Sequence, residues 1–293
     1  MQKNYDLIIV IPVGPAASVS FTADTINSIA YNITCSYKII LIDDSQKGLG
    51  AEIQKQFLQT DLLLTPQNNG RLCGLYITLC TAYKYAVNNY RFHLLFKVDT
   101  DALIINKNPE ADAFELFNNN SSIGMAGQYP STYKGTQWDI SWPQWSLNNQ
   151  LTAWRKFKHF RNFILNYWYK KALHRGYKTG ESVFGGSYFI SGKCLKVLNQ
   201  KGLLPMRMFK KLNLEEDHLF SLLVKAVGFD LGDLSSGNLP FACAWKELPA
   251  SPEKLFDEGK KVIHSTREYK NLNEADIRRF FQKVRNNAML YQQ

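Results

Sequence analysis

The amino-acid sequence predicts an α/β fold in which a central, mostly parallel sheet is flanked by helices. Short apolar runs of strand length alternate with amphipathic stretches over the first hundred residues, as in parallel strands that are buried on both faces. Three runs end in residues suited to ligand binding: Pro12-Val13-Gly14-Pro15, Asp43-Asp44-Ser45 and Asp99-Thr100-Asp101. The 293 residues, 45% of them hydrophobic, are enough for one large core.

Four strands are expected in the first hundred residues, at 5–11, 37–42, 62–64 and 93–98. Pro12 and Gly14 end the first of them, and Asp99 directly follows the fourth. Three helices are expected between the strands, at 21–31, 50–59 and 72–87. The last of these helices is the clearest, because its apolar residues recur at helical spacing.

The second part of the chain has a looser pattern, without an internal repeat. Helices are expected at 109–117, 192–198, 219–227 and 274–286, and strands at 123–127, 183–190 and 261–264. Two glycines lead into the strand at 183–190, and Gly228 ends the helix at 219–227. Residues 128–150 read as a polar loop with three tryptophans, and 154–178 as a basic, aromatic helical segment.

The net charge of +10 is concentrated rather than spread. Residues 140–180 contain eight Lys or Arg and no Asp or Glu, so a general nucleic-acid-binding surface is not expected. The five cysteines form no CxxC motif, which favours free thiols in a cytoplasmic protein. No apolar run is long enough for a transmembrane helix, and the N-terminus reads as a strand rather than a signal peptide.

Asp99 and Asp101 form the first candidate site. Residues i and i+2 of an extended chain face the same way, so two carboxylates are presented together at a strand end. A divalent cation between them would stabilise this arrangement. The alternative is an ordinary pair of solvated loop carboxylates, because a D-x-D tripeptide by itself is a weak signal.

Asp43, Asp44 and Ser45 form the second candidate site. They could cap a strand-to-helix turn. They could instead accept a hydrogen bond from a nucleotide base or ribose hydroxyl, as acidic residues do at other nucleotide-binding strand ends.

Seven motifs together resemble the GT-A class of nucleotide-sugar-dependent glycosyltransferases, which has a Rossmann-like sheet. In order they are VIPVGP (10–15), LIDDS (41–45), NNGRLCGL (68–75), KVDTDALI (97–104), FGGSYFIS (184–191), LEEDHLF (214–220) and VIHS (262–265). The early motifs are similar to family 2 of these enzymes, and the GGS…EED portion is similar to β-1,3-galactosyltransferases. The resemblance implies a single domain over 1–293, with a nucleotide-sugar-binding half (1–104) and an acceptor-binding half (105–293) that ends in a helix.

The resemblance also implies roles in donor binding. Pro12 and Val13 would line the nucleoside pocket, Asp43 would pair with uracil, and Arg71 would face the phosphates or the donor sugar. Gly185 and Gly186 would let the backbone approach the sugars closely. Here Gln46 and Lys47 follow Ser45, where family 2 usually has a glycine.

The implied metal is Mn2+ or Mg2+. Asp101 would bind it, and Asp99 would lie near it and the ribose. His264 would complete the metal sphere and favour Mn2+. A hydrogen-bonded structural histidine is the equal alternative for His264.

Glu215, Glu216 and Asp217 open a predicted helix, where acidic residues are routine stabilisers of the helix dipole. The family pattern instead implies that Asp217 is the catalytic base and that Glu216 orients the acceptor.

Residues 154–178 leave three interpretations open. The segment could lie on an anionic membrane at the inner face of the cell, where a lipid-linked acceptor would be found. It could bind an acidic glycan, or it could simply be a packed helix with a solvated basic face.

The expected function is metal-dependent, inverting transfer of a hexose from a UDP-sugar to a glycan or lipid-linked glycan. One alternative is a sugar-1-phosphate nucleotidyltransferase, although VGPAAS (13–18) lacks the basic residues of its phosphate loop. Another alternative is a non-catalytic glycan-binding protein with a decayed site.

Overall fold

The computed structural model describes residues 2–155 and 160–290. Its centre is a seven-stranded sheet with the strand order β10-β8-β9-β6-β2-β3-β4. Strand β9 is antiparallel to both of its neighbours, and the remaining pairs are parallel. The strands are β2 (Leu7–Val13), β3 (Tyr37–Asp43), β4 (Asp61–Leu64), β6 (Leu94–Val98), β8 (Ile123–Gly127), β9 (Ser187–Ser191) and β10 (Asp230–Asp233). The predicted fold class is confirmed.

Helices cover both faces of this sheet. On one face lie α1 (Val19–Asn32), α2 (Leu49–Gln56) and α4 (Pro109–Asn119). On the other lie α3 (Cys73–Asn89), α5 (Ser141–Arg155), α6 (Phe160–Leu173), α7 (Gly192–Gln200) and α8 (Glu216–Ala226). Alternate residues of β2 face opposite ways, so Leu7 packs into one core and Ile8 into the other.

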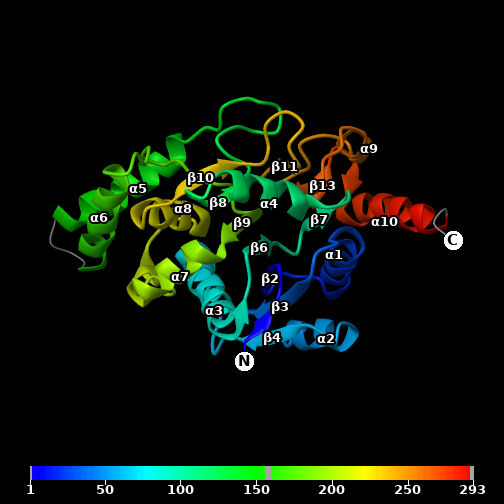
Figure 1. Cartoon of the computed structure of the whole chain (residues 1–293), viewed down its shortest axis with the longest axis horizontal. Helices are drawn as coiled ribbons and strands as arrows, with labels where there is room; N and C mark the ends of the chain where they lie inside the picture. The colour runs from blue at the N-terminus through cyan, green and yellow to red at the C-terminus, as the bar shows by residue number, and fades with distance from the viewer. Residues whose placement is uncertain (1, 156–159, 291–293) are drawn as a thin grey trace.

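A second sheet of three strands carries part of the site. It has the order β11 (Phe241–Cys243), β12 (Val262–His264) and β7 (Ala102–Ile104). Helices α9 (Pro252–Asp257) and α10 (Glu274–Leu290) share a third core with it. Figure 1 shows α5 and α6 at one end of the molecule and α10 at the other.

The shorter elements complete the fold. Strands β1 (Lys3–Asn4) and β5 (Tyr90–Arg91) pair in parallel, and β13 (Glu268–Tyr269) and β14 (Leu272–Asn273) form a small antiparallel pair. A 3-10 helix spans Arg207–Lys211.

The prediction of a polar loop over 128–150 is wrong in its second part, because α5 begins at Ser141. The Asp139 carboxylate accepts a hydrogen bond from the Ser141 amide (2.9 Å), which holds the chain at the helix start. Leu147 and Leu151, four residues apart, are buried in the core, and this spacing is the helical signal that the loop interpretation overlooked.

The prediction of one helical segment over 154–178 is also wrong. Helices α5 and α6 pack against each other, and the Asn162 side chain donates to the Gln150 carbonyl (2.5 Å). In one continuous helix, residues 150 and 162 would lie about 18 Å apart along the axis, so this contact requires two separate helices. Residues 156–159 of the predicted basic face lie outside the described part of the chain.

Two further expectations concern the cysteines and the membrane. All five cysteines are free, as predicted, and four of them are buried. Over the residues that the structure describes, no helix has the length and apolar character needed to span a bilayer.

Candidate functional site

Strands β2, β3 and β6 run in parallel, so their carboxyl ends meet at one edge of the central sheet. Asp43 ends β3, and Asp99 follows the last residue of β6. Ligands of open α/β sheets bind beyond this edge.

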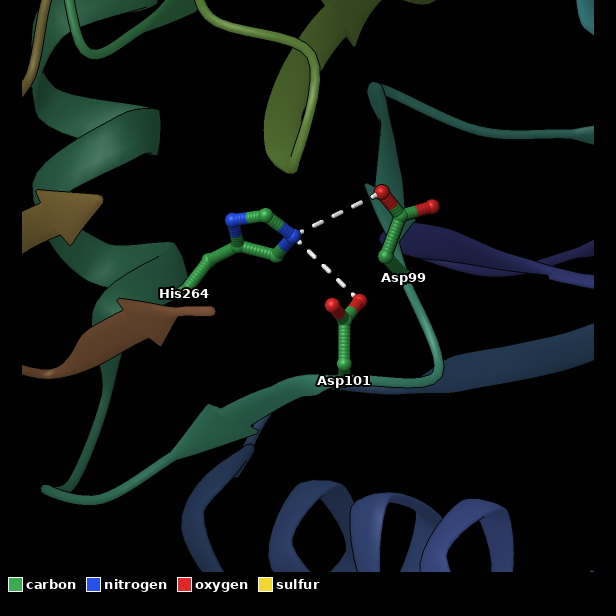
Figure 2. A group of neighbouring side chains, drawn as sticks. All are labelled: Asp99, Asp101 and His264. Carbon is green, nitrogen blue, oxygen red and sulfur yellow. Dashed lines mark ion pairs between the residues drawn. The ribbon is translucent and has the colours of Figure 1, made fainter. Parts of the chain in front are cut away.

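Asp99, Asp101 and His264 come together at this edge (Figure 2). We call these three residues the cation cluster, because together they could hold a metal cation. One ligand atom from each residue lies within 4.8 Å of the others. The His264 Nε2 atom is 3.3 Å from an Asp101 oxygen and 3.8 Å from an Asp99 oxygen. The antiparallel pairing of β12 with β7 places His264 opposite Ala102, next to the aspartate turn.

The orientation of the His264 ring suits a cation ligand. Its Nδ1 atom lies 2.9 Å from the Ala244 carbonyl oxygen, which can only accept a hydrogen bond. Nδ1 therefore carries a proton, and in the neutral ring the Nε2 lone pair faces the two aspartates. Two carboxylates and one imidazole nitrogen form a donor set that fits Mn2+.

The charges around Asp101 are balanced by neighbouring cations. Burial raises the pKa of Asp101, but the effect of His264 and then of Arg267 is stronger and holds it well below its usual range. The Arg267 Nε atom is 2.8 Å from Asp101, and the Ser265 hydroxyl donates to the same carboxylate (3.0 Å). Burial lowers the pKa of His264, but attraction to Asp101 and Asp99 raises it overall. A divalent cation could replace the positive charge of a protonated His264.

Lys97 on β6 is a functional candidate that the sequence interpretation missed. Its side chain is fully buried, and its ammonium lies 2.6 Å from Asp99 and 3.7 Å from Glu216 and donates to the Gly185 carbonyl. Burial lowers the pKa of Lys97, but Asp99 and Glu216 raise it overall. The available signal was a lysine inside the apolar run HLLFKV.

Lys97 thus links the cation cluster to the start of α8, where Glu215 is the N-cap residue. Burial raises the pKa of Glu216 well above its ordinary value, although Lys97 opposes this effect. Burial, followed by repulsion from Asp217, raises the pKa of Glu215 to about 7. The Asp217 carboxylate accepts from the His218 amide (2.8 Å) and lies 3.7 Å from the His218 ring nitrogen Nε2.

The two glycines before β9 make room for these side chains. A Cβ atom added to Gly186 would lie 2.5 Å from the His264 ring. One added to Gly185 would lie 3.0 Å from carboxylate oxygens of Asp217 and Glu216. The glycine pair therefore lets the cation cluster and the α8 carboxylates lie against the same backbone.

Most of these groups line one cavity of about 560 Å³, a size typical of ligand sites, whereas Asp101 and Lys97 lie behind its lining residues. Its charged lining residues include Asp99, Glu215, Glu216, Asp217, His264 and Arg267. Its aromatic lining residues are Trp138, Trp142, Phe184 and Trp245.

Asp43 and Asp44 hold the turn after β3. The Asp43 carboxylate accepts from the amides of Ser45 and Gly50, both at 2.8 Å. Asp44 accepts from the Asn69 amide (3.0 Å), so it anchors the loop before α3. This geometry matches the capping alternative for Asp43, while contact of Asp43 with a base stays a prediction.

The remaining donor-binding candidates lie near this turn or at the end of β2. Pro12 and Val13 are buried, and Arg71 is exposed. Arg71 lies close enough to Glu215 to lower its pKa, against the larger effect of burial. None of these three residues, nor Asp43, is among the cavity-lining residues in the described part of the chain.

Comparisons with known proteins give matches at the level of structure. No family model matches the chain, and no curated protein matches its sequence. The chain is similar to the apo structure of the bifunctional glycosyltransferase WbbM, with 12% identity and a TM-score of 0.50. The match covers 97% of this chain and 50% of WbbM, so the chain spans about half the length of that protein.

Two weaker structural similarities are also found. Galactosyltransferase LgtC, in complex with donor and acceptor sugar analogs, gives 10% identity and a TM-score of 0.49 over 96% of this chain and 95% of LgtC. Mannosyltransferase PcManGT from Pyrobaculum calidifontis, in complex with GDP-Man and Mn2+, gives 10% and 0.45 over 80% of this chain and 56% of that chain. At 12% identity the match to WbbM establishes a shared fold.

Proposed function

We propose that this protein is a metal-dependent, inverting glycosyltransferase that moves a hexose from a UDP-sugar to a hydroxyl group of a glycan or lipid-linked glycan. The observation that carries the proposal is that Asp99 and His264, which are grouped with Asp101, line the same cavity as the Glu216 and Asp217 carboxylates. Metal-assisted departure of a diphosphate and deprotonation of an acceptor require these two groups side by side. The fold shared with the glycosyltransferase WbbM supports the same function.

In the donor site, Asp101, Asp99 and His264 would hold Mn2+ or Mg2+. The ion would neutralise the negative charge that develops on the diphosphate leaving group. Pro12, Val13 and Asp43 would contact the nucleoside, and Asp43 would do so while its carboxylate caps the turn after β3.

Around the donor sugar and phosphates, Arg71 and the backbone of Gly185 and Gly186 would provide the contacts. Arg71 is exposed and lies close to Glu215, which lines the cavity. The two glycines present backbone at the cavity surface without a side chain.

Asp217 would act as the base. It would take the proton of the acceptor hydroxyl while that oxygen forms a bond to the anomeric carbon. The bond from that carbon to the diphosphate would break, and the diphosphate would leave with the electron pair. Glu216 would orient the acceptor through a hydrogen bond, because it lines the same cavity directly beside Asp217.

Thermal unfolding with UDP, GDP or CDP, each with and without Mn2+, tests the donor site. A ligand at about 100 times its Kd stabilises the folded state by roughly 2.7 kcal/mol. We expect stabilisation by UDP that requires Mn2+ and is lost in Asp101→Ala. The matched control is Asp139→Ala, which removes a cavity-lining carboxylate outside the cluster. Stabilisation by GDP or CDP alone would mean that the donor carries that nucleotide instead of UDP. No stabilisation by any nucleotide would contradict the proposal.

Asp217→Asn tests the base. The substitution keeps the shape of the side chain but removes its basicity, so transfer should be lost while stabilisation by UDP and Mn2+ is retained. Turnover in this variant at the wild-type rate would exclude Asp217 as the base.

A membrane surface is the partner that the outer face of α6 supports. Phe160 and Tyr167 are exposed on this helix, and Lys171 lies over the Tyr167 ring beside Lys170. Exposed aromatic rings next to lysines suit an anionic lipid surface, which would place the enzyme at the cytoplasmic face of a membrane.

Lys170→Glu combined with Lys171→Glu should weaken co-sedimentation with phosphatidylglycerol vesicles, whereas Lys254→Glu on α9 should not. Equal sedimentation of wild type with phosphatidylcholine and phosphatidylglycerol would contradict this.

A further inference from the structure

Two tryptophan side chains that line the cavity are more exposed to solvent than aromatic side chains packed in a core. Trp142 on α5 is 46% exposed, and Trp245, just after β11, is 69% exposed. A tryptophan presents a large apolar surface, so leaving two of them open to solvent at a cavity forgoes the stabilisation that burial would give.

Trp142 lies beside the candidate base. Its ring centre is 5.7 Å from that of His218, and the His218 ring nitrogen is 3.7 Å from the Asp217 carboxylate. Trp142 and Asp217 therefore contact opposite sides of the same histidine and line the same cavity.

Trp245 lies beside the cation cluster. The preceding residue, Ala244, forms two hydrogen bonds with His264: its amide donates to the His264 carbonyl (2.6 Å), and its carbonyl accepts from the His264 ring (2.9 Å). These contacts hold the backbone before Trp245 next to His264, and the Lys246 ammonium lies 4.7 Å from the centre of the Trp245 ring.

The charges between the two rings indicate the kind of molecule that fits there. The carboxylates of Asp139 and Asp217 line the same cavity as Trp142, and Asp139 precedes Trp142 by three residues. Among the cavity-lining residues that the structure describes, Arg267 is the sole Lys or Arg, and it pairs with Asp101 on the cluster side. An anionic sugar would be repelled near Trp142, whereas a neutral pyranose could stack its C–H face on the ring and donate its hydroxyls to the carboxylates.

One polar atom in this region lacks a partner. The His218 Nδ1 atom is buried and makes no hydrogen bond to any residue that the structure describes. Because unpartnered buried polar atoms are rare in native structures, a ligand or water is expected to satisfy it.

We propose that Trp142 and Trp245 form the aromatic walls of the acceptor subsite. Trp142 stacks against a neutral pyranose next to Asp217, and Trp245 borders the same pyranose on the side of the cation cluster. This inference rests on the proposed transferase function. It specifies that function by making the sugar that receives the hexose uncharged, and it disfavours an acidic glycan at this position.

The test uses methyl glycosides as probes of the full-length chain with UDP and Mn2+ present. Binding of the neutral methyl glucoside, galactoside and N-acetylglucosaminide is measured by calorimetry and compared with binding of methyl glucuronide. For Trp142→Ala and Trp245→Ala we expect roughly a tenfold rise in Kd for the neutral glycoside that binds best, and a smaller rise for Trp142→Phe. The matched control is Trp145→Ala, since Trp145 is exposed on the same helix and does not line the cavity.

Thermal stabilisation by UDP with Mn2+ is measured in the same variants, and we expect it to be unchanged. Its loss in a tryptophan variant would assign that tryptophan to the donor and overturn the subsite. The proposal is also overturned if wild type binds no neutral glycoside, prefers the glucuronide, or is matched in affinity by Trp142→Ala. If wild type shows no stabilisation by any nucleotide but binds neutral glycosides through Trp142, the transferase proposal fails while the sugar site stands.

Discussion

The His264 ring reaches the Asp99–Asp101 turn because Gly186, which has no side chain, leaves space for it. Gly186 lies so close to the ring that even a methyl group would overlap it, at 2.5 Å. The sequence interpretation gave Gly186 the role of admitting a sugar. The structure adds a second physical reason for a glycine at this position, which is packing against the metal-ligand candidate itself.

Gly186→Ala should therefore disturb the cluster. Overpacking of this kind costs about 1–3 kcal/mol, so we expect a lower unfolding free energy together with weaker stabilisation by Mn2+ and UDP. Gly14→Ala is the control for the unfolding free energy, because an added Cβ at Gly14 meets nothing within 4 Å. Equal Mn2+-dependent stabilisation in wild type and Gly186→Ala would show that the His264 position is not constrained by Gly186.

Glu215 should make the stability of the folded chain decrease as pH rises. Its pKa rises from the ordinary value of 4.5 to about 7 in the folded chain, chiefly through burial. Between these two values the unfolded chain is ionised while the folded chain still holds its proton, so the contribution of Glu215 to stability falls as pH rises through this window.

Glu215→Gln removes this contribution, so its stability relative to wild type should increase from about pH 4 to about pH 8. Urea unfolding of both proteins at several pH values measures the difference. A difference that stays constant with pH would mean that the Glu215 carboxyl group is not perturbed.

At the scale of elements, the last helix of the chain supports the aspartate turn. Arg278 on α10 is 1% exposed, and its guanidinium donates to the Thr100 carbonyl (2.7 Å), between the two aspartates. It also pairs with Asp24 on α1 (3.1 Å) and with Glu274 (2.8 Å). The amphipathic pattern predicted this helix, but not its contact with residue 100.

Arg278→Ala would leave Asp24 and Glu274 with fewer partners in a buried position. Breaking a buried ion pair by removing one partner costs about 3–5 kcal/mol, which chemical denaturation would measure. Arg279→Ala is the matched control, since Arg279 is exposed and pairs with Asp276 at the surface; we expect a loss of about 0–1 kcal/mol. Similar losses in the two variants would contradict a bracing role for Arg278.

At the scale of the whole molecule, the thiols report on the compactness of the core. All five cysteines are free, and burial raises the pKa of even the most accessible one, Cys35, to about 12. Because the thiolate is the reactive form, the native chain should react slowly with a thiol reagent, whereas five thiols should react at once in denaturant. A reductant should leave the unfolding temperature unchanged. Rapid reaction of several native thiols would indicate that the core opens readily.

The sequence by itself determined the central strands, most of the helices and the two aspartates after β6. These features depend on local sequence, because strand-length apolar runs, helical spacing and the residues that end each element involve only a few neighbouring positions. The same local patterns were misread where apolar residues were sparse, so Leu147 and Leu151 did not reveal α5.

Only the tertiary structure decided which distant groups share the site. Asp101 and His264 are far apart in the chain, as are Lys97 and Glu216, and Trp142 and Trp245. The proximity of these groups arises from the pairing of β12 with β7 and from the packing of α5 and α8 against the sheet. Such long-range distances depend on how whole faces pack together, and no periodicity within one segment specifies them.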